Sequence, residues 1–215
     1  DFKDFFPSIK WHDLKPILQS WHASSDIDWE LDADAENLIR RSCFYLNDAL
    51  PIGYPSSPII SNVVMFSLDV EISSVFSDSE KYGNVVYTRY ADDIVLSTDK
   101  KGMSKDLISA ISGVIMKSTS PVLLLNPKKT KIGSSSGGTA TVTGIRVCND
   151  GHLTIHRHHK DHIRLLLSLY KKGSLNKDEH SSLLGHLSYV QYIAPSFYSK
   201  LQKKYFKEIA ALKEK

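Results

Sequence analysis

Residues 85–98, VVYTRYADDIVLST, decide the fold, because two runs with strand character meet at the adjacent carboxylates Asp92 and Asp93. Neighbouring acids between apolar flanks repel each other and lose hydration unless positive charge lies between them. Divalent metal ions, shared with a third acid from elsewhere in the chain, would supply that charge. The alternative is an ordinary Asp-Asp turn on a solvated edge. The apolar and aromatic flanks favour the metal-binding hairpin.

A third acid stands at the start of the sequence, in residues 1–9, DFKDFFPSI. Asp1 comes at the end of an expected strand, which the aromatic pair and Pro7 would stop. This segment is weak evidence by itself, but it makes Asp1 the candidate partner of the acid pair.

Charge is divided unevenly along the chain. Residues 1–99 hold 7 Lys and Arg against 17 Asp and Glu, a net charge of −10, whereas residues 100–215 hold 20 against 7, a net charge of +13. An acidic, metal-holding half joined to a basic half suits a protein that handles a phosphate backbone. For any single lysine, a solvated charged surface remains the alternative.

Length and cysteine usage bound the class of protein. A chain of 215 residues allows one large domain or one domain with a small appendage. Cys43 and Cys148 stand alone with no metal-type spacing, which indicates reduced, structural thiols in a cytoplasmic protein. No apolar run approaches the roughly 18 residues of a membrane span, so no membrane partner is expected.

Local patterns predict the elements around the hairpin. Helices are expected within residues 10–49, after a cap at Ser57, at residues 105–117, and from residue 158 with breaks at 173–174 and 194–195. Short strands are expected at residues 122–125, 139–147 and 153–155, an acidic surface segment at residues 26–36, and a flexible turn at residues 134–138. Two sets of apolar residues are expected to be buried: Ile59, Val63, Phe66 and Val70 in one helix, and Tyr189, Tyr192, Phe197 and Tyr198 in the C-terminal region.

Five segments in a fixed order carry a resemblance to a known family. They are residues 1–9 (DFKDFFPSI), 50–62 (LPIGYPSSPIISN), 90–93 (YADD), 126–130 (NPKKT) and 141–144 (TVTG). In this order they resemble a bacterial reverse transcriptase of the retron or related phage-defence type, with group II intron enzymes more distant. The resemblance runs through nearly all 215 residues, and residues 142–144 are its retron-like element.

The resemblance implies an α/β (α+β) fold with two parts. Residues 1–151 would form a palm, an antiparallel sheet with helices packed on one side, and residues 152–215 a small thumb-like helical domain. A complete member carries a fingers region before the first catalytic acid, and this sequence begins on that acid. We therefore expect the fingers region to be absent from these residues and the chain to be a palm and thumb from a longer protein.

The same resemblance assigns the catalytic centre. Asp1 and Asp92 would bridge two Mg²⁺ ions, with Mn²⁺ as an alternative, and Phe2 belongs to the same metal site. Side chains alternate along a strand, so Asp93 is expected to be the more peripheral of the acid pair. Lys129 resembles the lysine that protonates the leaving pyrophosphate, with a plain basic loop as an equal alternative.

Substrate contacts are expected on both sides of this centre. Backbone N–H groups of Asp4 and Phe5 would hold triphosphate oxygens, with the Asp4 side chain in a structural role. Phe6 lies where family members place a ring against the sugar C2′, which would select dNTPs, unless Phe6 is a core residue. Phe5 is expected to fill that core role.

A second substrate contact is expected in residues 50–62. Gly53 and Pro55 would shape a turn that lets the backbone approach the incoming nucleotide. Ile52 stands where relatives usually carry Gln, so a polar contact is lost and templated fidelity is put in question.

Nucleic-acid contacts are expected in the basic half. They are Tyr90, then Val142, Thr143 and Gly144 near the primer end, and Arg157, Lys160 and Arg164 at helix-like spacing along the backbone. Without the resemblance, Val142–Gly144 would be an ordinary strand with a bulge glycine. The histidines at 152, 156, 158, 159 and 162 invite a zinc interpretation, but we set it aside because no Cys and no acid–His spacing typical of a closed site accompany them.

Together these residues imply an RNA-directed DNA polymerase of a bacterial retron or antiphage defence system. Its partners would be a structured non-coding RNA template, the DNA product, dNTPs, and an effector or toxin protein. Two alternatives stay open: a defence polymerase that makes DNA with little or no templating, and an inert RNA-binding scaffold. Retention of all three acids argues against the scaffold, because a scaffold has no physical reason to keep a repulsive cluster.

Overall fold

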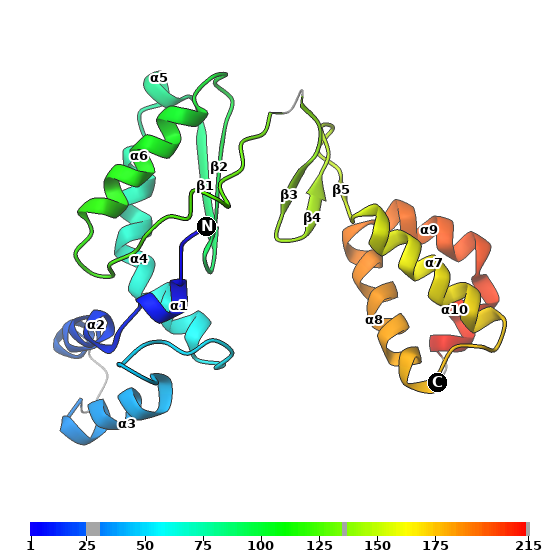
Figure 1. Ribbon diagram of the computed structural model, residues 1–215, viewed down its shortest axis with the longest axis horizontal. Helices are drawn as coiled ribbons and strands as arrows, with labels where there is room; N and C mark the ends of the chain where they lie inside the picture. The colour runs from blue at the N-terminus through cyan, green and yellow to red at the C-terminus, as the bar shows by residue number, and fades with distance from the viewer. Residues whose placement is uncertain (25–30, 135–136, 214–215) are drawn as a thin grey trace. The chain divides into compact units, whose positions relative to one another are not determined.

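A computed structural model of the chain describes residues 1–24, 31–134 and 137–213. The chain divides into two compact units, Asp1–Ile132 and Gly133–Lys215, called unit 1 and unit 2 below (Figure 1). Helices dominate both units, and each holds one small antiparallel sheet. The sequence-based boundary after residue 151 differs from this division in the placement of the second sheet, which the structure groups with the C-terminal helices.

Unit 1 packs helices against one β-hairpin. Its elements are α1 (Phe5–Ser8), α2 (Trp11–Ser24), α3 (Ala33–Cys43), α4 (Ser57–Val75), α5 (Ser79–Tyr82), β1 (Val85–Tyr90), β2 (Asp93–Thr98) and α6 (Ser104–Lys117). In Figure 1, α4 and α6 lie beside the hairpin. The predicted helix at residues 105–117 is confirmed as α6, which buries Leu107, Ile111, Val114 and Ile115. The expected strand at residues 122–125 is reduced to one antiparallel bridge, between Phe2 and Leu125.

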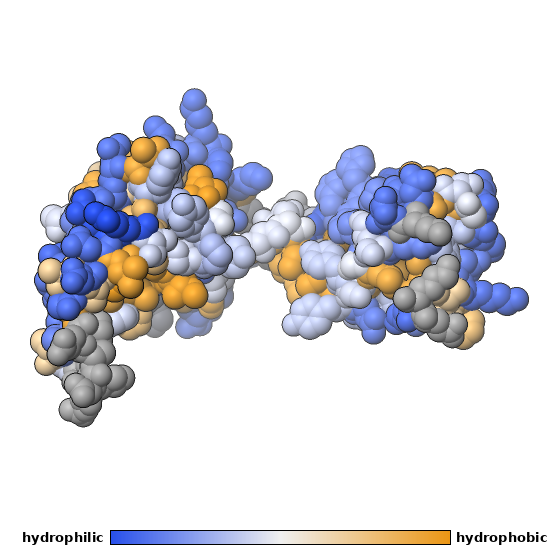
Figure 2. All heavy atoms as spheres, turned by 90° about the horizontal axis from the view of Figure 1, so that it is seen from below, coloured by the Kyte–Doolittle hydropathy of each residue, from blue (hydrophilic) through white to orange (hydrophobic). Residues whose placement is uncertain are grey.

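Helix α4 is rotated relative to the prediction. Three residues of the face expected to be buried are exposed: Ile59 by 69%, Phe66 by 68% and Val70 by 53%. The structure instead buries Ser57, Ser61, Val64, Met65, Leu68 and Ile72. The helix is apolar almost all round, so its periodicity does not select a face. Hydrophobic patches consequently remain on the surface of unit 1 (Figure 2).

The start of α4 also differs from the expected cap. Ser56 occupies the N-cap position without a side-chain cap, and the hydroxyl of Ser57 donates instead to the carbonyl of Pro51 at 2.6 Å. This bond fastens the preceding loop to the helix.

By length and composition alone, α4 is long and apolar enough to cross a membrane, contrary to the expectation that no such run exists. This single helix is weak evidence for a membrane span, because a core helix passes the same test. Its buried side belongs to the core of unit 1, and its Asp69 is ion-paired with Arg89. Both observations favour a core helix.

Unit 2 combines a three-stranded sheet with a helical bundle. The strands β3 (Ala140–Val142), β4 (Ile145–Val147) and β5 (Leu153–Thr154) are antiparallel in that order, and α7 (Arg157–Lys171), α8 (Lys177–Ile193), α9 (Pro195–Lys204) and α10 (Phe206–Lys213) follow. The predicted helix breaks at residues 173–174 and 194–195 are confirmed. Phe197 and Tyr198 are buried as expected, but Tyr189 (38% exposed) and Tyr192 (86% exposed) are not, so the prediction is wrong for these two.

Two expected loops lie partly outside the described residues: the acidic segment at 26–36 and the turn at 134–138.

Candidate active site

The acid pair lies at a two-residue turn between β1 and β2. Tyr90 pairs with Asp93, so Ala91 and Asp92 form the turn; we call residues 91–93 the acid turn. Ala91 has φ +51°, a left-handed conformation that alanine rarely adopts. Asp92 and Asp93 are half-buried, whereas Tyr90 is 75% exposed. The predicted hairpin with an acidic tip is confirmed.

The start of the chain lies against the acid turn. The Phe2 N–H donates to the Asp92 carbonyl at 3.0 Å, and the Phe2 ring is buried in the core. On its other side the segment pairs with residues 124–126, where the Asn126 N–H donates to the Asp1 carbonyl at 2.9 Å. The structure thus brings the backbone of Asp1 beside Asp92, although the two are 91 positions apart in the sequence.

Lys129 lies next to the third acid. Its Nζ is 3.6 Å from Asp1 Oδ2, and the Asp1 side chain is 16% exposed. A turn positions it, in which the Lys129 N–H donates to the Asn126 carbonyl at 3.1 Å. Among the described lysines, Lys129 is the one that pairs with an acid of this group, which distinguishes it from Lys128 and Lys131.

The three acids supply the hard oxygen ligands that Mg²⁺ prefers. Their carboxylates do not gather within 4.8 Å of one another; in the described part of the chain the group of three that does is Cys148, Asp150 and His152. The donor chemistry fits a divalent metal, and the assignment of Asp1, Phe2, Asp92 and Asp93 to it stays a prediction.

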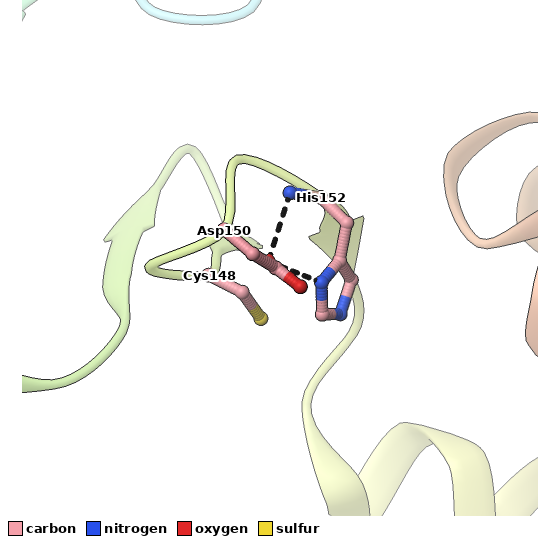
Figure 3. Close-up of side chains that lie close together, drawn as sticks. All are labelled: Cys148, Asp150 and His152. Carbon is pink, nitrogen blue, oxygen red and sulfur yellow. Dashed lines mark hydrogen bonds and ion pairs between the residues drawn. The ribbon is translucent and has the colours of Figure 1, made fainter.

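The second group corrects one premise of the sequence analysis, which found no Cys near the histidines (Figure 3). His152 Nδ1 lies 2.5 Å from Asp150 Oδ1, and the His152 N–H donates to the same oxygen at 3.2 Å. These bonds lower the pKa of Asp150. Both side chains are exposed, and the contacts close the turn between β4 and β5.

The expected substrate residues all precede the acid turn in the sequence, and they differ in their exposure to solvent. Phe5 is 4% exposed, which confirms its core role, while Phe6 is half-buried and meets the Phe5 ring edge-on at 5.3 Å. Asp4 precedes α1 in a left-handed conformation, φ +47°. Helices leave their first N–H groups without intrahelical partners, so the N–H of Phe5 at the start of α1 has no acceptor within the helix.

The loop before α4 presents its residues to solvent. Ile52 is 77% exposed, and Pro55 is exposed as well. Gly53 has φ +89°, so glycine is required there by backbone conformation rather than by lack of space.

The retron-like element forms the turn of the β3–β4 hairpin. Val142 pairs with Ile145, and both central residues have positive φ, Thr143 at +47° and Gly144 at +83°. This is the geometry of a tight hairpin turn, so the bulge interpretation is wrong. Thr143 and Gly144 are exposed.

The basic residues of α7 are partly neutralised. Arg164 Nη1 lies 2.6 Å from Asp161 Oδ1, and Arg157 Nε lies 3.6 Å from Asp161 Oδ2. Lys160 and Arg164 both lie over the Phe197 ring, at 5.4 and 5.1 Å from its centroid.

Sequence reasoning missed two contributors to this basic surface, Arg146 on β4 and Lys200 on α9. The pKa of Lys160 is lowered by burial and then by the positive charges of Arg164, Arg146 and Lys200. These residues come from three elements, so no local spacing could have indicated the cluster. Sequence reasoning also missed Asp69, whose partners Tyr87 and Arg89 lie 18 and 20 residues away.

Comparison with known proteins is consistent with this site. A family model described as "Reverse transcriptase (RNA-dependent DNA polymerase)" matches residues 1–185. The retron Ec73 reverse transcriptase of Escherichia coli is 44% identical over 97% of this chain and 66% of that relative. The retron Ec83 and Ec86 reverse transcriptases of the same organism are 32% and 29% identical, over 79% and 96% of this chain and 55% and 61% of those relatives.

The chain spans 55% to 66% of the length of these relatives. The matched range contains all five motifs and the acid turn with its neighbours Asp1 and Lys129. The family implies dependence on a divalent metal. The chain therefore belongs to the reverse transcriptase family, in its bacterial retron-type branch.

Proposed function

We propose that this chain carries the palm and thumb of an RNA-directed DNA polymerase, which adds dNTPs to the 3′ end of a primer. The observation that carries the proposal is the hydrogen bond from Phe2 to the Asp92 carbonyl, because it fastens the first acid beside the acid turn. Membership of the reverse transcriptase family supports the same chemistry.

Two divalent ions, Mg²⁺ or Mn²⁺, would be held by Asp1 and Asp92, with Asp93 at the periphery. When bound, such ions lower the pKa of the primer hydroxyl and neutralise charge on the reacting phosphate. Lys129 lies next to Asp1. From this position it would donate a proton to the leaving pyrophosphate.

Phe6 selects the sugar in this proposal. The half-buried ring of Phe6 packs against the buried ring of Phe5, which holds it in place. The half-burial leaves part of the Phe6 ring accessible to a substrate. A fixed ring against the sugar C2′ excludes a 2′-hydroxyl by volume. The backbone N–H groups of Asp4 and Phe5 would hold the triphosphate oxygens, and the loop with Ile52, Gly53 and Pro55 would approach the incoming nucleotide and the template base.

Unit 2 holds the nucleic acid. The exposed turn at Thr143 and Gly144, together with Arg157, Lys160 and Arg164, contacts a structured non-coding RNA and the growing DNA. The retron names of the relatives support this type of template, and an effector or toxin protein would be a further partner.

Primer extension by the full-length protein tests the proposal. The protein is incubated with a structured RNA, Mg²⁺ and dNTPs, and the DNA is sequenced. We expect DNA complementary to the RNA. A homopolymer or random sequence would support untemplated synthesis, for which the apolar Ile52 is the motivating residue. RNA binding without any DNA would support the inert scaffold.

A further inference from the structure

A partly buried ion pair between Arg89 and Asp69 supports the acid turn. Arg89 on β1 is 5% exposed in its side chain and grips Asp69 on α4 with two bonds, Nε to Oδ1 at 2.9 Å and Nη2 to Oδ2 at 2.6 Å. Tyr87 adds a third bond, from its hydroxyl to Asp69 Oδ1 at 2.6 Å. This forked geometry fixes the plane of the guanidinium.

The remaining edge of that guanidinium reaches the acid turn. Arg89 Nη1 donates to the carbonyl of Ala91 at 3.1 Å. That carbonyl belongs to the peptide plane that ends at the nitrogen of Asp92. Ala91 is in a left-handed conformation that costs energy for a residue with a Cβ, so the bond from Arg89 adds support to this plane.

The same side chain contacts the aromatic layer of the substrate site. The Arg89 guanidinium carbon lies 5.8 Å from the centre of the Phe5 ring, and Phe5 supports Phe6. The Arg89 side chain therefore contacts both the backbone before Asp92 and the Phe5 ring. Phe5 in turn supports Phe6, the proposed sugar-selecting residue.

The electrostatics keep this group charged. Burial alone would lower the pKa of Arg89, but hydrogen bonds to Asp69 and its negative charge raise it overall. Burial, followed by the bond to Asp69, raises the pKa of Tyr87, so Tyr87 stays a neutral donor. Asp69 thus holds the charged guanidinium of Arg89 in one orientation.

We propose that Arg89 and Asp69 are positioning residues: Asp69 orients Arg89, and Arg89 fixes the peptide plane that aims Asp92 at the metal. The inference rests on the proposed polymerase function. Neither residue touches substrate, so the loss should appear in kcat and in metal affinity rather than in KM.

Arg89→Lys is the primary test, because lysine keeps the charge but cannot bond Asp69 twice and reach Ala91 as well. The full-length variant should fold, with a kcat about tenfold lower and a KM for dNTP within about twofold of wild type. Mn²⁺ affinity, measured by electron paramagnetic resonance of the free ion, should fall about tenfold. Asp69→Asn should shift both quantities in the same direction.

Asp48→Asn is the matched control. Arg40 grips Asp48 through the same fork, at 2.8 and 2.6 Å, away from the acid turn, and asparagine tolerates the positive φ of Asp48. It should leave kcat and Mn²⁺ affinity unchanged. If Asp69→Asn fails to fold, Tyr87→Phe replaces it; it removes one bond to Asp69 and should lower kcat two- to threefold.

A folded Arg89→Lys variant with wild-type kcat and wild-type Mn²⁺ affinity would overturn the proposal. So would a drop in activity that merely follows the folded fraction. If wild type itself makes no DNA, the polymerase function fails, whereas the Mn²⁺ comparison between wild type and Arg89→Lys still decides the positioning role.

Discussion

The β1–β2 and β3–β4 hairpins share one feature of turn conformation but differ in the contacts that hold the turn. Each has a two-residue turn that begins with a left-handed non-glycine residue, Ala91 in unit 1 and Thr143 in unit 2. The first turn is bonded to Arg89 and Phe2. The second is exposed, and the Thr143 hydroxyl donates to the neighbouring carbonyl of Val142.

This difference separates a turn that is fixed before ligand arrives from one that a partner can shape. Charge follows the same division: unit 1 holds 14 Lys and Arg against 18 Asp and Glu, and unit 2 holds 13 against 6. Fixed acids suit metal-assisted phosphoryl transfer, which demands accurate geometry. An exposed turn on a basic unit suits recognition of a phosphate backbone with a local structural feature.

The largest effect should come from the acid turn. Asp92→Asn should lower nucleotide addition by at least about 10³-fold while the protein stays folded, because one ligand that bridges the metal ions is lost. Steady-state primer extension measures the change. Asp99→Asn makes the same substitution at the other end of the hairpin, where Asp99 bonds Asn84, and should retain activity. Robust synthesis by Asp92→Asn would show that the acid turn is no metal site.

Lys129→Ala should lower kcat by about 10²-fold, the usual contribution of a general acid. The matched variant is Lys128→Ala, which removes a neighbouring positive charge that is not paired with Asp1. Single-turnover rates of both variants separate the proton donor from a plain basic loop. Equal losses in the two variants would assign Lys129 to the loop.

Phe6→Ala should raise the use of rNTPs relative to dNTPs about tenfold, since the ring acts by volume alone. Competition between the two nucleotides in one primer-extension reaction gives the ratio. Phe206→Ala removes an exposed phenylalanine of unit 2 and should leave the ratio unchanged. An unchanged ratio in Phe6→Ala would make Phe6 a core residue and place sugar selection elsewhere.

The smallest effect should come from the exposed turn at Thr143 and Gly144. Thr143→Ala should weaken binding of the cognate structured RNA about three- to tenfold and leave an arbitrary RNA–DNA hybrid unaffected, because the turn carries selectivity and few phosphate contacts. Thr141→Ala, two residues earlier on β3, serves as the control. Equal losses on both nucleic acids would remove the distinction between the two hairpins.

Sequence could predict the elements whose signal is local. The β1–β2 hairpin followed from alternation around an acid pair, and the helix breaks in unit 2 followed from Gly173 and Pro195. The buried face of α4 could not be predicted, because apolar residues surround that helix and tertiary packing selects the face.

The ion pair that supports the acid turn could not be predicted from the sequence, for a related reason. Asp69 and Arg89 each look like ordinary surface charges in sequence, and only the fold brings α4 and β1 together to pair them. Likewise, Cys148 and His152 became neighbours through a β-turn rather than through a metal-binding spacing.

Diffraction from crystals of the full-length protein soaked with Mn²⁺ and a dNTP, recorded at the manganese absorption edge, tests the central claim most directly. The account predicts two anomalous peaks about 4 Å apart, between the carboxylates of Asp1 and Asp92. Peaks at Cys148, Asp150 and His152, with none at the acid turn, would contradict it.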